Sequence, residues 1–301
     1  MNINFIFPGQ GSQYIGMAKK IFRVNDYAKK IISYANDILG YNIEKVCSDS
    51  NGLVNQTKYT QPAIFLFNTI ADFIVKDAGY SPTAYAGHSL GEYSALVSSG
   101  CISFEDALSI IKVRADEMAS AENYRSGKMA AVINLNNEQF KYIQNQVKGI
   151  VVIANYNSHK QTIISGESNA VDDFLVLAKK ENMRTLPLNV SGAFHSPLMN
   201  DAMIKVEDYI NNVKFNNIDK PIYQNFSPNR NYNNSKIKCN LTKQITSSVR
   251  WVESISNIAN DISLNFLEVG PNKVLSKLNN NINKEINTIC FEETISYEKS
   301  S

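Results

Sequence analysis

The sequence predicts an α/β fold in which a mainly parallel sheet organises the larger part of the chain. Strand-like and helix-like segments alternate from one end to the other, which is the order of elements that parallel sheets require. Two local patterns add detail: a strand that turns into a helix around Ser89, and a run of six elements within residues 127–187 that predicts a separate compact module. With 301 residues, the chain is long enough for one large domain with a smaller insertion.

The N-terminal segment predicts the first strand and the loop that follows it. Residues 3–7 are largely apolar and lead into a glycine-rich turn at residues 8–11, which precedes a helix-like stretch over residues 15–22. The two glycines of the turn allow the loop to direct backbone N–H groups inward. Taken alone, the loop fits an ordinary strand-to-helix turn better than a functional one.

The segment from Ala84 to Leu96 places a serine at a sharp turn between a strand and a helix. Its core is Gly-x-Ser-x-Gly, in which Gly87 and Gly91 flank Ser89 at positions where a Cβ would collide with the crossing backbone. Apolar residues recur at helical spacing after the turn, and Gly100 marks the expected end of the helix. This geometry suits a nucleophile, although the pattern by itself is only moderately specific.

Residues 127–187 predict a compact module of four strands and two helices. The order is strand, helix, strand, strand, helix, strand, which is the ferredoxin-like pattern. We therefore predict a large domain made of residues 1–126 and 188–301, with residues 127–187 as an inserted subdomain. The six expected elements are residues 129–135, 137–146, 150–155, 161–165, 171–180 and 185–188.

A serine hydroxyl needs a base within hydrogen-bonding distance, and His195 is the best candidate in this chain. It lies in a loop just before Pro197, a context that allows the ring to be directed into a cleft, although a lone histidine is more often structural. We expect His88 to support the turn beside the serine, and His159 to be exposed and uninvolved. No acidic residue between Ser89 and His195 stands out as a third catalytic group.

Composition and spacing exclude several functional classes. The net charge of +2 is too small to indicate nucleic-acid binding, and the apolar runs are too short to span a membrane. The four cysteines form no CxxC pair and the three histidines lack metal-ligand spacing, so we expect no metal, no other cofactor and no disulfide framework. Because the chain enters a strand directly, without a targeting segment, we expect a cytoplasmic protein.

Two motifs together suggest a family. Phe-Pro-Gly-Gln-Gly-Ser-Gln at residues 7–13 and Gly-His-Ser-Leu-Gly-Glu-Tyr at residues 87–93 resemble the malonyl-CoA:acyl carrier protein transacylases, which include enzymes of fatty acid synthesis and acyltransferases of polyketide synthases. The resemblance implies a hydrolase-like large domain with a parallel sheet, interrupted by a small ferredoxin-like subdomain, with the active site in the cleft between them. Four further segments extend the resemblance almost end to end: residues 113–118, 190–199, 244–251 and 268–275.

The resemblance also implies roles for individual residues. Ser89 would be the nucleophile and His195 its base, while the backbone N–H groups of Gln10 and Leu90 would form the oxyanion hole. The group that orients the histidine would be the backbone carbonyl of Gln244. One departure is Asn272, where the family commonly has glycine; asparagine also tolerates a positive φ.

Two further residues concern the choice of substrate. Arg114 matches the arginine that binds the substrate carboxylate in the family, although an arginine on a helix is usually exposed on the surface. Phe194 would fill the space beside the α-carbon of bound malonate and so favour malonyl over methylmalonyl groups. Residues 214–250 carry seven basic residues against one acidic residue, which indicates a solvated surface or a face that docks an acidic carrier protein or CoA phosphates.

The resulting functional prediction is a ping-pong acyl transfer without a cofactor. Malonyl-CoA would acylate Ser89, and the phosphopantetheine thiol of acyl carrier protein would then take the malonyl group, for fatty acid synthesis. The first alternative is a discrete acyltransferase of a polyketide synthase with the same chemistry. An acyl-thioester hydrolase would admit water to the acyl-enzyme, and Arg114 argues against it. A carrier-docking protein without catalysis is the remaining alternative.

Overall fold

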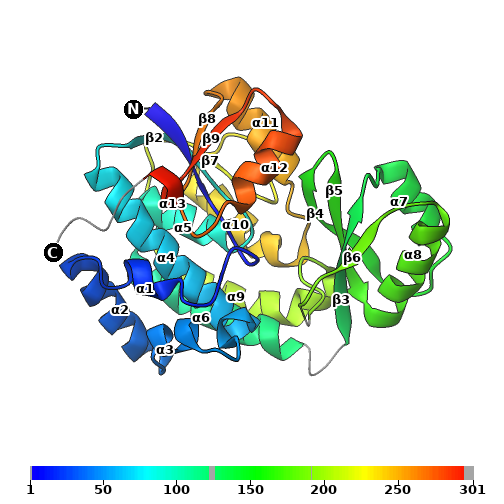
Figure 1. Cartoon of the computed structure of the whole chain (residues 1–301), viewed down its shortest axis with the longest axis horizontal. Helices are drawn as coiled ribbons and strands as arrows, with labels where there is room; N and C mark the ends of the chain where they lie inside the picture. The colour runs from blue at the N-terminus through cyan, green and yellow to red at the C-terminus, as the bar shows by residue number, and fades with distance from the viewer. Residues whose placement is uncertain (1, 122–125, 191, 295–301) are drawn as a thin grey trace.

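A five-stranded sheet forms the centre of the larger lobe of the computed structural model, which describes residues 2–121, 126–190 and 192–294 (Figure 1). The strand order is β7-β2-β1-β8-β9, and every neighbouring pair is parallel. This arrangement confirms the predicted parallel sheet. Its strands are β1 (Asn2–Phe7), β2 (Ser81–Gly87), β7 (Ile222–Tyr223), β8 (Asn265–Glu268) and β9 (Asn287–Cys290).

Strand β1 shows why this sheet is buried on both faces. Phe5 and Phe7 pack into the core formed with α2, α4 and α6, whereas Ile6 points to the opposite face and packs against α11 and α12. Because side chains alternate along a strand, a central strand with apolar residues at consecutive positions needs helices on both sides. The carboxyl ends of these strands all lie at one edge of the sheet, and β2 leads into Ser89 there.

Eleven described helices surround the parallel sheet, with three short 3₁₀ turns between them. No described helix combines the length and the apolar character that are needed to cross a membrane. The α-helices are α1 (Ala18–Ile21), α2 (Asp26–Leu39), α3 (Ile43–Ser48), α4 (Thr57–Asp77), α5 (Gly91–Ser98), α6 (Phe104–Ser120), α9 (Asn200–Asn212), α10 (Asn234–Lys243), α11 (Trp251–Asp261), α12 (Val274–Ile282) and α13 (Phe291–Thr294). The 3₁₀ turns are η1 (Leu53–Asn55), η3 (Pro197–Met199) and η4 (Gln244–Thr246).

The helix predicted over residues 15–22 is shorter than expected. Only α1 (Ala18–Ile21) is helical, because Gly16 has a φ of 87° and donates its N–H to the carbonyl of Cys47 at 2.7 Å. The chain therefore turns against α3 before the helix begins. Near the C-terminal end of the sequence, Asn272 has a φ of 65°, so the expected positive φ at that position is confirmed.

The second sheet is antiparallel and, with α7 and α8, forms the smaller lobe at the right of Figure 1. Its order is β4-β5-β3-β6, and the succession β3-α7-β4-β5-α8-β6 confirms the ferredoxin-like prediction. Phe140 and Phe174 on the two helices pack into a separate apolar core. The elements are β3 (Gly127–Ile133), α7 (Asn137–Gln144), β4 (Val151–Ser158), β5 (Gln161–Glu167), α8 (Ser168–Lys180) and β6 (Thr185–Pro187).

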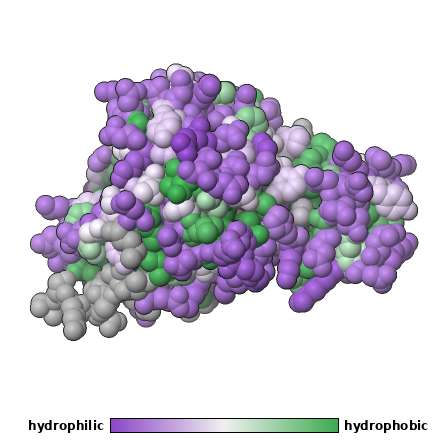
Figure 2. Space-filling model, turned by 90° about the horizontal axis from the view of Figure 1, so that it is seen from above, coloured by the Kyte–Doolittle hydropathy of each residue, from purple (hydrophilic) through white to green (hydrophobic). Residues whose placement is uncertain are grey.

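We propose the boundaries expected from the sequence as the domain division of this protein. The separate core and the continuous run from β3 to β6 support a subdomain over residues 127–187. The large domain would then comprise residues 1–126 and 188–301, of which residues 1, 122–125, 191 and 295–301 lie outside the described residues. Figure 2 shows the two lobes from above, with hydrophilic residues over most of this face and hydrophobic ones gathered toward its middle.

Candidate active site

Ser89 lies between β2 and α5 with a left-handed backbone, at a φ of 51°. A Cβ on Gly87 would lie 2.0 Å from the backbone of Gly91, and a Cβ on Gly91 would lie 2.0 Å from the carbonyl oxygen of Phe7. No side chain fits at either distance, so both glycines are required for the turn, as predicted. The turn brings the serine hydroxyl to the carboxyl edge of the parallel sheet, between the two lobes.

His195 reaches Ser89 from the loop before η3 and is only 4% exposed. Its Nε2 lies 2.7 Å from Ser89 Oγ, and its Nδ1 lies 2.9 Å from the backbone carbonyl oxygen of Gln244. Because a carbonyl only accepts hydrogen bonds, Nδ1 carries the proton and Nε2 presents a lone pair to the serine. Burial and the positive charge of Arg114 lower the pKa of His195 to about 3, which keeps the ring neutral at neutral pH.

The backbone conformations of Ser89 and His195 are unusual for residues other than glycine. In the described part of the chain, five residues other than glycine have a positive φ, and three of these are asparagines, which tolerate this conformation. The other two are Ser89 and His195, with φ values of 51° and 57°. Such backbone strain is concentrated at functional sites.

Arg114 lies on α6 and is only 1% exposed, which differs from the usual surface position of arginine. Its Nη2 donates to Ser89 Oγ at 3.2 Å and to Gln244 Oε1 at 3.3 Å, and its Nη1 donates to Gln61 Oε1 at 2.5 Å. The guanidinium also lies 5.5 Å from the centre of the Tyr93 ring. Burial lowers the pKa of this arginine. None of the described carboxylates forms an ion pair with it.

The glycine-rich loop after β1 packs directly against the serine turn. A Cβ on Gly9 would lie 2.3 Å from the carbonyl oxygen of His88, so the loop reaches this position only with glycine there. Gln10 and Leu90 both line the cavity beside Ser89. Within the described ranges, no acceptor takes a hydrogen bond from the backbone N–H of either residue. Two unpaired donors are thus available near the serine hydroxyl.

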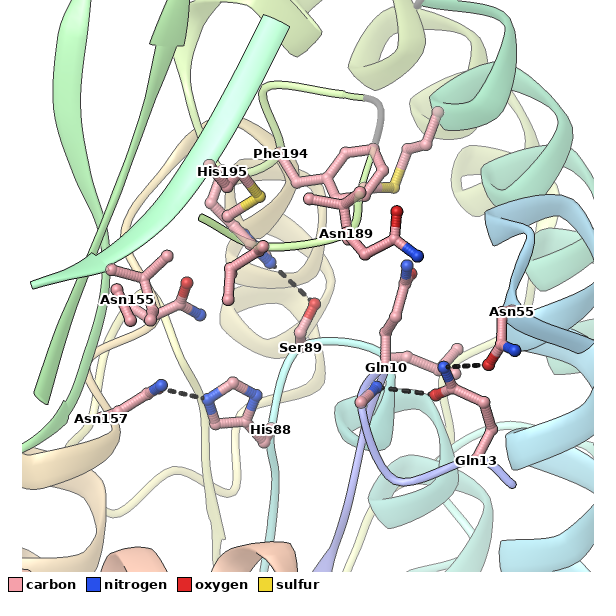
Figure 3. Close-up of a pocket in the computed structure, with 18 of the residues that line it drawn as sticks. Gln10, Gln13, Asn55, His88, Ser89, Asn155, Asn157, Asn189, Phe194 and His195 are labelled. Atoms are coloured by element: carbon pink, nitrogen blue, oxygen red, sulfur yellow. Dashed lines mark hydrogen bonds between the residues drawn. The ribbon is translucent and has the colours of Figure 1, made fainter. Parts of the chain in front are cut away.

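A cavity of about 410 Å³ opens over Ser89 between the two lobes. Figure 3 shows Ser89 and His195 facing each other, with Asn155 and Asn157 on one side and Asn189 on the other. Phe194 also lines the cavity and is 5% exposed. The smaller lobe contributes Met129, Ala131, Asn155, Asn157, Gln161 and Ile163.

The other histidines lie where the sequence predicts. His88 points away from the serine, and its Nε2 lies 2.8 Å from Asn157 Oδ1 across the junction of the two lobes (Figure 3). Its ring also contacts the edge of Trp251, with 5.4 Å between the ring centres. His159 is exposed in the turn after β4. His88 therefore ties the serine turn to the subdomain.

Sequence reasoning missed the amide side chains around this cavity. Gln61, which accepts from Arg114, lies on α4, which begins far from any recognised motif. Asparagine is abundant throughout the chain, so no local signal separates the asparagines of the cavity from the others. The basic residues singled out over residues 214–250 are not among the described residues that line the cavity. The missed amides in its lining are Gln13, Asn55, Asn155, Asn157, Gln161 and Asn189.

Comparison with known proteins connects this geometry to a family. A family model described as "Acyl transferase domain" matches residues 4–293. The chain belongs to the acyl transferase family. The malonyl CoA-acyl carrier protein transacylase of Bacillus subtilis is 34% identical over 296 residues, which cover 97% of this chain and 93% of that protein. The resemblance to these transacylases, inferred from the sequence motifs, is therefore confirmed.

Other relatives of this acyl transferase come from polyketide synthesis. The B. subtilis polyketide biosynthesis malonyl CoA-acyl carrier protein transacylase PksC is 36% identical over 288 residues, covering 94% of this chain and 98% of PksC. Among solved structures, a malonyl-transacylase in complex with its type II PKS acyl-carrier protein has a TM-score of 0.90 and 30% identity, with 96% of each chain covered. The fold predicted for this acyl transferase is thus confirmed over almost the whole chain.

Proposed function

We propose that this protein transfers the malonyl group of malonyl-CoA to the phosphopantetheine thiol of acyl carrier protein through a malonyl-Ser89 intermediate. The observation that carries the proposal is the buried guanidinium of Arg114, 3.2 Å from Ser89 Oγ, whose partners are amide oxygens and a hydroxyl. The Glu92 carboxyl interacts with this cation, but no described carboxylate lies within ion-pairing distance of it, and such a buried cation is unfavourable unless a ligand supplies a close carboxylate. The free carboxylate of a malonyl thioester meets this need, and it brings the thioester carbonyl close to the serine.

In the first half-reaction, Ser89 Oγ attacks the thioester carbonyl while His195 Nε2 takes the hydroxyl proton. The backbone N–H groups of Gln10 and Leu90 stabilise the negative charge that develops on the carbonyl oxygen. The carbon–sulfur bond then breaks, and the imidazolium returns its proton to the departing CoA thiolate. The carbonyl of Gln244 holds Nδ1 and so keeps the ring in the required tautomer.

The second half-reaction runs through the same groups in reverse. The phosphopantetheine thiol of the carrier gives its proton to His195 Nε2 and attacks the carbonyl carbon of the malonyl-Ser89 ester. The bond between that carbon and Ser89 Oγ breaks, and the imidazolium returns the proton to Oγ. A third catalytic residue, such as an acid beside His195, is not required, because a thioester is more reactive than an amide and releases a good leaving group. The malonyl carboxylate also lowers the repulsion between Arg114 and a protonated His195, so the bound substrate makes the histidine a stronger base.

We expect Arg114→Ala to change donor preference more than folding. Loss of the charge-assisted clamp lowers the rate constant for Ser89 acylation by malonyl-CoA about 10- to 100-fold. Acylation by acetyl-CoA, which has no carboxylate, stays level or rises. Single-turnover acylation with each donor, followed by intact mass, checks the prediction. Arg23→Ala, at an exposed arginine paired with Glu44, serves as the control; equal losses with both donors would make Arg114 a structural residue.

The choice between malonyl and methylmalonyl groups is assigned to Phe194. The Phe194 ring lines the cavity, where it would limit the space beside the α-carbon of a bound malonyl group. We expect the unaltered protein to favour malonyl-CoA over methylmalonyl-CoA by roughly 10- to 200-fold in kcat/KM, the range that one methyl group supports. Phe194→Ser should reduce this ratio. An unchanged ratio together with a lower melting temperature would mean that the ring only packs in the core.

Malonyl loading of a polyketide carrier is a second candidate, with the same chemistry. It is favoured by the 36% sequence identity to PksC and by the structural similarity to a malonyl-transacylase whose structure was solved in complex with its polyketide carrier. Malonyl transfer rates measured with fatty acid and polyketide carriers separate the two candidates. A thioester hydrolase is less consistent with the buried cation near Ser89.

We place the reaction in the cytoplasm, where the buried free thiols of Cys47 and Cys101 would stay reduced.

A further inference from the structure

The side chain of Asn225 bridges the two peptide units on either side of His88. Its Oδ1 accepts the backbone N–H of Ser89 at 2.7 Å, and its Nδ2 donates to the carbonyl oxygen of Gly87 at 2.6 Å. Asn225 is fully buried and follows β7, the strand that pairs with β2. One side-chain amide, two residues after the neighbouring strand, therefore binds both ends of the serine turn.

This bridge acts on the most constrained backbone of the site. Ser89 has a φ of 51°, so its N–H points away from the helix that follows and needs an acceptor outside it. The carbonyl oxygen of the same residue accepts Gln244 Nε2 at 3.0 Å. Two side chains distant in sequence thus bind the two polar backbone groups of Ser89. A left-handed serine held in this way keeps its hydroxyl aimed at His195.

A buried carboxylate fixes Asn225 in turn. Glu92, in the first turn of α5, is fully buried, and its Oε2 accepts the backbone N–H of Asn225 at 2.8 Å. Its Oε1 accepts Gln224 Nε2 at 2.9 Å. Burial raises the pKa of the Glu92 carboxyl to about 7, which reflects how unfavourable this position is for a charge. The carboxylate joins α5 to the residues after β7, although the proposed reaction makes no use of it.

We propose that Asn225, anchored by Glu92, is a positioning residue that locks the backbone of Ser89 for acylation. The inference rests on the proposed function, because acylation of Ser89 is the step that it affects. Without the bridge, the serine turn can relax, and the 2.7 Å contact between Ser89 Oγ and His195 Nε2 is lost from much of the population. Displacements of about 1 Å at a reacting group can cost on the order of 100-fold in rate.

The test is the rate constant for Ser89 acylation in Asn225→Ala, measured by quenched single turnovers and intact mass, per molecule of folded protein. We expect a fall of about 10- to 100-fold with malonyl-CoA and an equal fall with acetyl-CoA, because both donors need the same serine geometry. The apparent KM for malonyl-CoA stays within about twofold, since Asn225 does not line the cavity.

Asn240→Ala is the matched control, because Asn240 Nδ2 donates to Gln224 Oε1 at 3.0 Å without contacting the serine turn. Its acylation rate should stay within about twofold of the unaltered rate. Glu92→Gln is the second variant. It keeps the shape of the side chain but replaces one acceptor oxygen by an NH₂ group, which then faces one of two donors, Gln224 Nε2 or the backbone N–H of Asn225. We expect it to slow acylation with both donors in the same proportion. If Asn225→Ala does not fold, Glu92→Gln decides the question.

The inference is overturned if either variant acylates at the unaltered rate per folded molecule, or if the loss falls on malonyl-CoA alone. A melting temperature that drops while the rate per folded molecule stays constant would give Asn225 a purely structural role. If the unaltered protein is not acylated at all, the proposed function fails instead, and the two failures are therefore distinguishable.

Discussion

His195→Ala is expected to slow acylation of Ser89 by malonyl-CoA at least about 100-fold. The serine hydroxyl is a poor nucleophile at neutral pH, and His195 Nε2, 2.7 Å away, is the acceptor that faces it. The carbonyl of Gln244 fixes the tautomer, so alanine removes both the base and its orientation. Binding of malonyl-CoA depends mainly on other groups, and its KM should change much less than kcat. Rapid quench followed by intact mass gives the acylation rate constant directly.

His159→Ala is the matched control, because this histidine is exposed in the turn after β4 and lies outside the cavity lining. Its rate of acylation should equal that of the unaltered protein. If His195→Ala retains more than about a tenth of the rate, another group must accept the serine proton. A comparable loss in His159→Ala would point to a general effect on the protein rather than to the proposed base.

Ser89→Ala is expected to abolish acylation entirely, because alanine offers no atom that can form the ester. The change removes a single oxygen atom. The left-handed backbone conformation at this position is about as unfavourable for alanine as for serine. The protein should therefore fold, and its melting temperature should stay close to that of the unaltered chain. Loss of the adduct in a folded variant separates the chemistry of Ser89 from any role in stability.

The sequence predicted best those parts of the fold that are determined by interactions within a short segment of the chain. A Cβ on Gly87 would collide with the backbone of Gly91, so this part of the turn could be predicted from five consecutive residues, whereas Gly91 is required by the carbonyl oxygen of Phe7 on β1. The ferredoxin-like module over residues 127–187 was equally accessible, because each of its elements has its own apolar pattern and the module has its own core. The helix expected over residues 15–22 was too long, since the backbone N–H of Gly16 donates to the carbonyl of Cys47 in α3, a partner that is distant in the sequence.

The groups that sequence reasoning missed act across long distances in the chain. Asn225 bonds to Ser89 over 136 residues, and Gln61 bonds to Arg114 over 53 residues. Neither residue has a local pattern that marks it. The group that orients the histidine is a backbone carbonyl, which every residue possesses, so only the family resemblance pointed to Gln244. Burial of Arg114 was also invisible in the sequence, and it is the observation on which the choice of substrate depends.

The most direct test of the central claim is the intact mass of the protein after incubation with malonyl-CoA in the absence of a carrier. The proposed mechanism predicts one added malonyl group, located on Ser89 by peptide mapping, and its loss when holo acyl carrier protein is added. Ser89→Ala should gain no mass under the same conditions. An unaltered protein that gains no malonyl group, or an adduct that persists in Ser89→Ala, would contradict the account.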